Sequence, residues 1–160
     1  MDQKKVEERD DVLVFTSSPL TSPMEVTGRV RARIWISADV PDTDFIARLC
    51  DVYPDGKSYN LCEGAIRARF RDGREKEKLM EPGKIYPIDI DLWSTSVIFN
   101  TAHRMRLQIT SSSAPGYDPN PNTGAPFRAN TDKRKANVKL YVDSKHPSHV
   151  VLPVVSPAHP

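Results

Sequence analysis

The sequence predicts an all-β protein, an antiparallel β-sandwich, from three observations. Apolar residues alternate with polar ones between residues 24 and 38 and again between 104 and 110, the period of a strand that buries one face. Turns rich in glycine and proline separate about eight to ten such short segments, a spacing typical of sandwiches and jelly rolls. No stretch of the chain favours a helix longer than about one turn.

The predicted strands follow one another through a single domain that we place at residues 11–156. In the strand 85–93, Pro87 lacks a backbone donor, so we expect this strand at a sheet edge or at a bulge. The predicted strands are 12–15, mostly buried; 24–38, with Val30, Ala32, Ile34 and Ile36 in the core; 44–52; 58–62; 64–71; 85–93; 104–110, with one dry and one wet face; 138–142; and 150–155.

Three segments lie outside this strand pattern. Residues 1–10 are highly charged and show no apolar periodicity, which predicts a solvated lead-in or linker. Residues 111–136 form a long loop with several prolines, and loops of this length in a compact domain are functional, packed against something, or mobile. Residues 157–160 form a short tail.

Composition and charge restrict the class of partner and the compartment. The 160 residues suffice for one core, and 23 basic against 21 acidic residues leave a net charge of +2, too small to favour nucleic acid or an anionic membrane surface. No apolar run approaches the roughly 20 residues of a membrane span, and the N-terminus is charged where a signal peptide would be apolar. We therefore expect a soluble, cytoplasmic protein.

The two cysteines, Cys50 and Cys62, flank a predicted hairpin turn at residues 53–57. A type I turn with a bulge at Gly56 would place them diagonally on one face, whereas a two-residue loop would place them on opposite faces. Neither arrangement suits a disulfide, so we expect free thiols, as in a reducing compartment.

No motif predicts catalysis or cofactor binding by this chain. The nearest approach to a serine-hydrolase nucleophile motif surrounds Ser58, which lacks the second glycine and the following helix. His103 precedes a strand rich in arginine and is better explained as a turn hydrogen bonder than as a base. We assign no catalytic residue and no cofactor.

Two clusters of potential metal ligands are better explained structurally. His146 and His149 have an i, i+3 spacing, but Pro147 favours a strand entry, in which residues three apart face opposite ways. An acidic cluster at Asp39, Asp42 and Asp44 lacks the glycine and distal glutamate of an EF-hand loop and is typical of turn capping. We assign no metal site.

Arginines recur at alternate positions along three predicted strands and should form ladders on the outer sheet faces. Trp35 shares its face with Arg31 and Arg33, which indicates a surface covered by another domain or paired with acidic residues. With Tyr117 and Phe127 of the long loop, these residues form our candidate interdomain surface. The alternating arginines are Arg29, Arg31, Arg33, Arg67, Arg69, Arg71, Arg104 and Arg106.

Five segments in colinear order carry a resemblance to a known family. They are DDVLVFTSSPLTSPMEVTG, DTDFIARLCDVYPDGKSYNLCEG, DLWSTSVIFNTAHRMRLQITSSS, NPNTG and HPSHVVLPVV. Together they resemble the C-terminal domain of the X-Pro dipeptidyl-peptidase and cocaine-esterase-like acyl hydrolases, from about Arg9 to Val155. In that family this portion is a jelly roll, also described as galactose-binding-like.

The resemblance implies that this domain has a non-catalytic role. In the family the Ser-Asp-His triad belongs to an α/β-hydrolase domain, and the C-terminal domain packs on the catalytic and cap domains and often contributes to dimers. It therefore implies an accessory domain whose partner is a serine hydrolase domain, in the same polypeptide or in a separate chain. The family domain also begins with a strand upstream of Met1, and without that strand we expect an unpaired sheet edge or an exposed apolar patch.

An alternative function is an independent carbohydrate-binding module, because jelly rolls often serve as lectins. Aromatic side chains on which sugars stack would carry this activity. The candidates are Trp35, Trp93, Tyr117 and Phe127.

Overall fold

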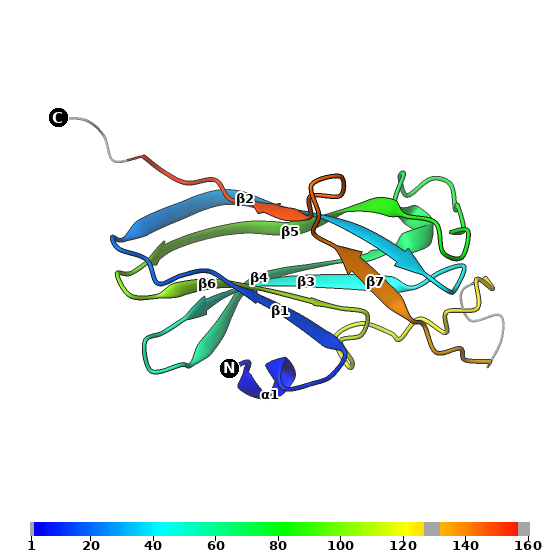
Figure 1. The fold of residues 1–160 in the computed structure, drawn as a ribbon, viewed down its shortest axis with the longest axis horizontal. Coiled ribbons are helices and arrows are strands. Elements are labelled where there is room, and N and C mark those ends of the chain that lie inside the picture. Colours follow the sequence, from blue (N-terminus) through cyan, green and yellow to red (C-terminus); the bar gives the residue numbers. More distant parts are fainter. Residues whose placement is uncertain (1, 127–131, 157–160) are drawn as a thin grey trace.

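The protein is an antiparallel β-sandwich, as the sequence predicts. A computed structural model describes residues 2–126 and 132–156. One sheet, which we call sheet A, has the strand order β1-β6-β3-β4, and the other, sheet B, has the order β5-β2-β7 with β8 also paired to β2 (Figure 1). The strands of sheet A are β1 (Val12–Thr16), β3 (Asp44–Val52), β4 (Ser58–Arg67) and β6 (Arg104–Thr110). Those of sheet B are β2 (Met24–Ala38), β5 (Tyr86–Phe99), β7 (Val138–Tyr141) and β8 (His149–Val151).

The core lies between the sheets and follows the predicted alternation. Ile34 and Ile36 of β2 are at most 1% exposed, and Ile88 and Ile90 of β5 pack with them in the same cluster. Pro87 lies in β5, which is an edge strand of sheet B, so the predicted edge position of this proline is confirmed.

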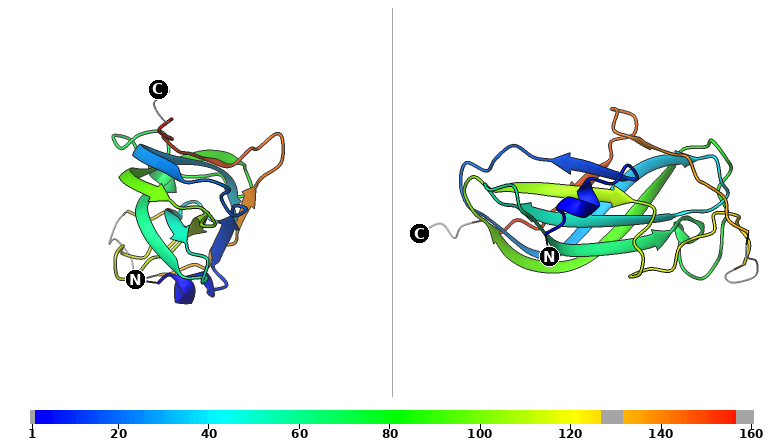
Figure 2. Two further views of the ribbon diagram at one scale, coloured as in Figure 1. Left: turned by 90° about the vertical axis from the view of Figure 1, so that its left-hand side faces the viewer. Right: turned by 90° about the horizontal axis from the view of Figure 1, so that it is seen from below.

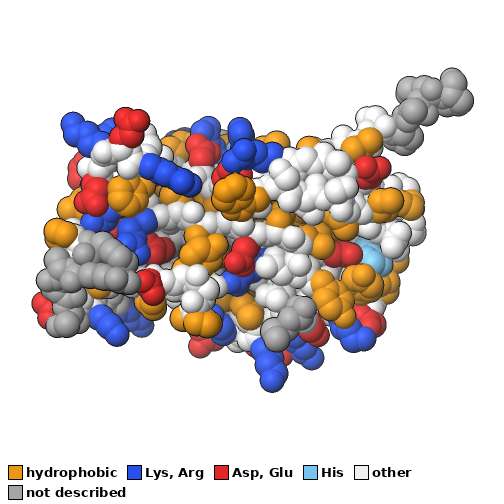
Figure 3. Space-filling model, turned by 180° about the vertical axis from the view of Figure 1, so that it is seen from behind, with side chains coloured by type: hydrophobic (Ala, Val, Ile, Leu, Met, Phe, Trp, Pro, Cys, Tyr) orange, Lys and Arg blue, Asp and Glu red, His pale blue; other side chains and the backbone are white. Residues whose placement is uncertain are grey.

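The sandwich is closed along the side where β4 meets β5. Gly64 of β4 faces the backbone of Asp91 in β5 so closely that a Cβ atom would lie 1.9 Å from the Asp91 carbonyl oxygen. Only a glycine allows two backbones to approach in this way. Seen from this side, charged and polar side chains are interspersed with small groups of apolar ones (Figure 3).

On the opposite side the two sheets end at separate edges. β1 is the edge of sheet A, and β7 and β8 lie end to end along one edge of β2 in sheet B. Figure 2 shows β1 and β7 on the same side of the molecule, away from β4 and β5. Apolar side chains, among them Leu13, Phe15 and Val142, are exposed on this side.

Three predictions about individual strands are wrong. The strand at residues 12–15 is not mostly buried, because only Val12 is enclosed and the next three residues are exposed. The stretch 64–71 does not form a strand of its own: β4 runs through Arg67, and a 3-10 helix, η1 (Ala68–Phe70), follows. The face of β6 that was predicted to be solvent-exposed is partly covered, since Gln108 and Thr110 are 1% and 3% exposed.

The N-terminal segment contacts that outer face through Glu7, although none of residues 2–10 is buried. The short helix α1 (Lys4–Glu7) places Glu7 against β6, where its carboxylate accepts hydrogen bonds from Arg106 at 2.5 Å and Gln108 at 2.9 Å. At its start, the backbone N–H of Gln3 donates to the carbonyl oxygen of Ser58 at 2.8 Å. The Glu7 carboxylate and the Gln3 backbone therefore hold this segment against sheet A.

Cys50 and Cys62 are free and buried, as expected. The turn between them has the three-residue form, with Gly56 at a φ of 86°. However, the register shifts at Leu49 and Cys50, so that Cys50 pairs with Asn60 while Leu49 pairs with Cys62. This bulge points the two thiols to opposite faces of sheet A, an arrangement that the turn alone did not predict.

The described parts of the long loop, residues 111–126 and 132–136, contain no helix or strand and pack on the sandwich. Asn120 donates hydrogen bonds to Asp42 at 2.9 Å and to Asp44 at 2.8 Å. Further along, the backbone N–H of Arg134 donates to the carbonyl oxygen of Pro121 at 2.9 Å. The Asn120 bonds hold the loop against the β2–β3 turn, and the Arg134 bond joins two parts of the loop to each other.

Candidate functional site: a groove between the sheets

A groove, which we call the β1–β7 groove, lies between the free edges of the two sheets. It consists of two adjoining hollows of about 340 Å³ and 400 Å³ that share Ile109 and Leu140. Core residues from both sheets, including Ile34 and Leu49, form its floor. These two floor residues are buried, so the exposed apolar surface of the groove lies on its walls.

Two side chains of β1 face this groove. Leu13 pairs with Ile109 and Phe15 pairs with Leu107, and directly opposite residues in an antiparallel pair share a face. Because Ile109 and Leu107 belong to the core face of β6, Leu13 and Phe15 also face the interior. They are nevertheless 46% and 41% exposed. An inward-facing apolar residue that remains exposed indicates a missing neighbour.

Across the groove, apolar side chains of sheet B also reach the surface. Leu140 of β7 and Val150 of β8 line it, and Val142, just beyond β7, is 65% exposed. Polar side chains lie mainly at the two ends of the groove, with Ser17 and His149 at one end and Asp10 at the other. The arrangement suits an apolar polypeptide segment.

The candidate residues on β2 lie elsewhere, on the outer face of sheet B. Arg33 is paired with Asp89 through hydrogen bonds of 2.7 Å, and Arg31 lies opposite Asp91 in the register of β2 and β5. Trp35 is half-buried and packs its ring edge against His146, at 5.3 Å between centroids. Exposed ion pairs therefore balance charges on this face, and the β7–β8 loop packs against Trp35.

The loop residues of the candidate surface do not join this group. Tyr117 lines a shallow hollow with Ile46 and Arg67 of sheet A, so it lies on the other side of the sandwich from Trp35. Phe127 lies outside the described residues. The structure therefore does not bring the predicted interdomain residues together into one surface.

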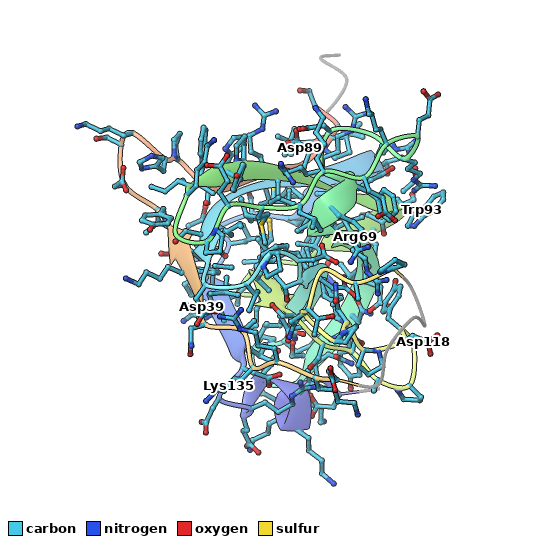
Figure 4. All side chains as sticks on the ribbon, turned by 90° about the vertical axis from the view of Figure 1, so that its right-hand side faces the viewer. Asp39, Arg69, Asp89, Trp93, Asp118 and Lys135 are labelled. Carbon is cyan, nitrogen blue, oxygen red and sulfur yellow. The ribbon has the colours of Figure 1, made fainter. Side chains whose placement is uncertain are left out.

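The aromatic residues proposed for carbohydrate binding are also dispersed. Trp93 is 65% exposed and lies near Arg29, six residues along β2 from Trp35. In Figure 4, Trp93 projects from the molecule, far from Asp39 and Lys135 beside β7. Among the described candidates, Trp35, Trp93 and Tyr117 do not line up as one stacking platform.

The histidines make local contacts. The Nδ1 atom of His103 lies 2.9 Å from a carboxylate oxygen of Asp51, and both residues are buried. His146 bonds to Asp143 at 3.1 Å, while His149 bonds to the carbonyl oxygen of Pro147 at 2.7 Å. In the described part of the chain, no three His, Cys, Asp or Glu side chains gather closely enough to hold a metal ion.

The acidic cluster near residue 42 forms separate structural contacts, in line with turn capping. Asp42 is fully buried and accepts hydrogen bonds from the backbone N–H of Arg69 at 2.9 Å and from its guanidinium at 2.8 Å. Asp44 pairs with Arg67, and Asp39 accepts from Asn137 at 2.8 Å. Figure 4 shows Arg69 among the loops at this end of the sandwich.

The pKa shifts fit a structural role for these groups. The hydrogen bond from Arg33 lowers the pKa of Asp89, and that from Arg29 lowers the pKa of Asp91. Burial raises the pKa of the Cys50 thiol to about 12 and that of Cys62 to about 11, which makes both poor nucleophiles at neutral pH.

Sequence reasoning missed Leu13 and Phe15 as surface residues. Their apolar run, Val12 to Phe15, resembles a buried strand because the sequence carries no information on whether a strand has a partner on each side.

Comparison with known proteins identifies the family. The family model described as the X-Pro dipeptidyl-peptidase C-terminal non-catalytic domain matches residues 2–151. The chain is similar to a cocaine esterase of Rhodococcus sp., with 42% identity over 156 residues that cover 96% of this chain and 27% of that protein.

Solved structures agree with this relationship. An aminopeptidase from a marine sediment archaeon, Thaumarchaeota archaeon, superposes with a TM-score of 0.92 at 30% identity, covering 97% of this chain and 27% of the other. An alpha-amino acid ester hydrolase superposes with a TM-score of 0.91 at 31% identity, covering 96% and 27%.

The chain thus spans about a quarter of the length of these relatives. Among the described residues, no helix has the length and apolar character that crossing a membrane requires. The chain belongs to the family of X-Pro dipeptidyl-peptidase C-terminal non-catalytic domains.

Proposed function

We propose that this chain is the accessory domain of a serine acyl hydrolase or peptidase and acts by packing on the catalytic and cap domains. The observation that carries the proposal is the β1–β7 groove, where inward-facing Leu13 and Phe15 remain 46% and 41% exposed. Burial of these side chains by a neighbouring domain would contribute about 25 cal/mol per Å² of apolar surface. The relatives, in which this domain is about a quarter of the chain, supply such a neighbour.

The proposed mechanism is positional. A domain that fixes the orientation of its neighbours holds their reacting groups in productive geometry, and a misplacement of about 1 Å can reduce a rate about 100-fold. Loss of the domain would therefore reduce activity through stability and alignment. The catalytic groups would all belong to the hydrolase domain.

A chimera tests this function. The chain replaces the matching segment of the Rhodococcus cocaine esterase, and ester hydrolysis and thermal unfolding are measured against the relative with that segment deleted. We expect the chimera to recover folding and activity that the deletion lacks. A chimera no better than the deletion would refute the packing role.

Paired variants test whether the groove is the contact surface. Leu13→Asp places a charge in the groove, whereas Ile98→Asp changes a similarly exposed apolar residue on β5, 54% exposed, on the other side of the sandwich. Both isolated variants should fold. In the chimera only Leu13→Asp should lower the Tm and the rate of hydrolysis, and equal effects of the two variants would contradict the assignment.

The remaining features of the proposal concern partners and compartment. The hydrolase domain would be joined in the same polypeptide or act as a separate chain, and homo-oligomers would form through the assembled enzyme. The proposal includes no nucleic acid or membrane partner. A cytoplasmic location is supported by the two buried free thiols, Cys50 and Cys62.

A further inference from the structure

We propose that Cys50 is a modification site that the N-terminal segment, residues 2–10, closes. When this segment lifts from sheet A, the thiol forms a mixed disulfide with a small disulfide that carries carboxylate and amide groups. The inference goes beyond the packing role, because it concerns the outer face of sheet A rather than the β1–β7 groove. It rests on the position of the thiol, the polar atoms around it and the attachment of the segment.

The bulge in β3 places the two thiols in different surroundings. Cys62 lies opposite Leu49 and belongs to the core cluster between the sheets. Cys50 instead lies opposite Arg106 of β6, and it is fully buried without belonging to that cluster. The right-hand view of Figure 2 shows α1 in front of the strands of sheet A. The N-terminal segment is therefore part of the cover over Cys50.

The polar atoms around the thiol are not all paired. The Gln108 amide donates to the Cys50 sulfur at 3.3 Å and to the Glu7 carboxylate at 2.9 Å, so it links the thiol to the segment. The carbonyl oxygen of this amide is buried, as is the hydroxyl of Ser58, which is close enough to lower the pKa of the thiol. Neither oxygen has a hydrogen-bond partner in the part of the chain that the structure describes. Buried polar atoms are normally paired, so both oxygens are suited to accept N–H groups of a ligand at the sulfur.

The N-terminal segment is held on sheet A by a few polar contacts. None of its residues is buried. At its start, the Ser58 N–H donates to Asp2 at 3.1 Å and the Ser58 carbonyl accepts from the Gln3 N–H at 2.8 Å, and at its end Glu7 bonds to β6. Segments with few buried contacts open locally while the rest of a domain stays folded. Opening of this segment therefore exposes Cys50 without loss of the core.

Opening also changes the charges that act on the thiol. In the closed form, burial raises the pKa of the Cys50 thiol to about 12, and the Glu7 carboxylate adds to this effect. The guanidinium groups of Arg48 and Arg106 act in the opposite direction. Release of the segment removes the Glu7 charge and exposes the sulfur, while Arg106 stays bonded to Thr16 at 2.8 Å. A thiol beside arginines has a lowered pKa and reacts more readily, so opening activates Cys50.

The groups that Glu7 leaves behind define the ligand. The Arg106 guanidinium and the Gln108 amide N–H bind the Glu7 carboxylate in the closed form and are suited to bind a carboxylate of the ligand in its place. A hollow of about 480 Å³ adjoins this pair and is lined mainly by charged side chains of the N-terminal segment and of the β3–β4 turn, such as Lys57. These groups favour a small, peptide-like disulfide that bears carboxylates.

The reaction is a thiol–disulfide exchange. The Cys50 thiolate attacks one sulfur of the ligand, so that a new S–S bond forms as the old one breaks. The other half of the ligand leaves as a thiolate and takes up the proton that Cys50 has lost. The bound half then occupies the place of Glu7 and keeps the segment off the sheet.

Thiol labelling with iodoacetamide at neutral pH, measured at each cysteine by mass spectrometry, tests the closure. Glu7→Ala should raise the labelling rate of Cys50 about tenfold and leave that of Cys62 unchanged, because it weakens only the attachment of the segment. Asp2→Ala, which loosens the other end of the segment, should also act on Cys50 alone. Glu8→Ala is the exposed control and should change neither rate. No rise at Cys50, or an equal rise at both thiols in each segment variant, would overturn the proposal.

Two disulfides test the chemistry of the ligand. Glutathione disulfide carries carboxylates and amides, whereas cystamine carries amines. The rate of mixed-disulfide formation at Cys50 in Glu7→Ala is divided, for each reagent, by the rate in the same chain unfolded in urea. This ratio should be higher for glutathione disulfide. An equal or higher ratio for cystamine would overturn the proposed ligand class.

Amide hydrogen exchange tests whether the adduct keeps the segment open. In the wild-type chain after prolonged incubation with glutathione disulfide, the Gln3 amide, which donates to Ser58 in the closed form, should lose its protection. Core amides of β2 should keep theirs. A modified chain in which Gln3 stays protected would show that Cys50 reacts without opening and would overturn the proposal.

Discussion

Gly64 in β4 and Asp91 in β5 join the two sheets by backbone contact, with only 1.9 Å between the position of a Cβ atom at residue 64 and the Asp91 carbonyl oxygen. Gly64→Ala should therefore destabilise the protein by about 1–3 kcal/mol or more, because one of the two strands must shift. Urea unfolding measures the change. The control is Gly116→Ala, where the nearest atom would be 3.3 Å away, and a similar loss in both variants would contradict this explanation.

The buried ion pair of Arg69 and Asp42 should be the most sensitive polar contact. Their side chains are 4% and 0% exposed, so Asp42→Ala leaves a buried guanidinium without its main partner, at a cost of about 3–5 kcal/mol. The exposed pair of Lys78 and Asp72 provides the control, since Asp72→Ala should cost less than about 1 kcal/mol. Equal unfolding midpoints for the two variants would argue against a structural role for Asp42.

The N-terminal segment should contribute to stability through Glu7. Glu7→Ala removes the acceptor of hydrogen bonds from Arg106 and Gln108 and should cost about 1.5–3 kcal/mol. Glu8→Ala, one residue further on and exposed, should change the free energy of unfolding by less than about 0.5 kcal/mol. Chemical denaturation distinguishes the two variants, and no difference between them would support a solvated lead-in after all.

The thiols should make stability fall at alkaline pH. The folded protein favours the neutral thiol, since burial raises the pKa of Cys62 to about 11 from 9.0. Its contribution is therefore complete below pH 9 and is lost as the pH rises from 9 towards 11, because only the unfolded chain ionises in that interval. Urea midpoints at pH 8 and 10 should differ more in the wild type than in Cys62→Ala, and parallel pH curves would contradict the raised pKa.

The sequence was sufficient to predict the sandwich because alternation specifies which side of each strand is buried. Ile34 and Ile36 were assigned to the core on that basis and lie there. The groove was not predictable in the same way, since Leu13 and Phe15 have the same local pattern as core residues and only the strand order shows that nothing lies opposite them. Similarly, the cover over Gln108 comes from a charged segment whose partners are about 100 residues away in the chain, as the separation of 101 residues between Glu7 and Gln108 shows.

The contact at Gly64 also affects the far side of the molecule. Since the layers touch along β4 and β5 and separate toward β1 and β7, the angle at which they meet determines how wide the opposite opening is. A substitution at this glycine would tilt one layer against the other and alter the fit of whatever lies between the free edges. Weakened assembly in such a variant would then reflect a changed spacing of the layers, caused by a residue on the side of the sandwich away from the groove.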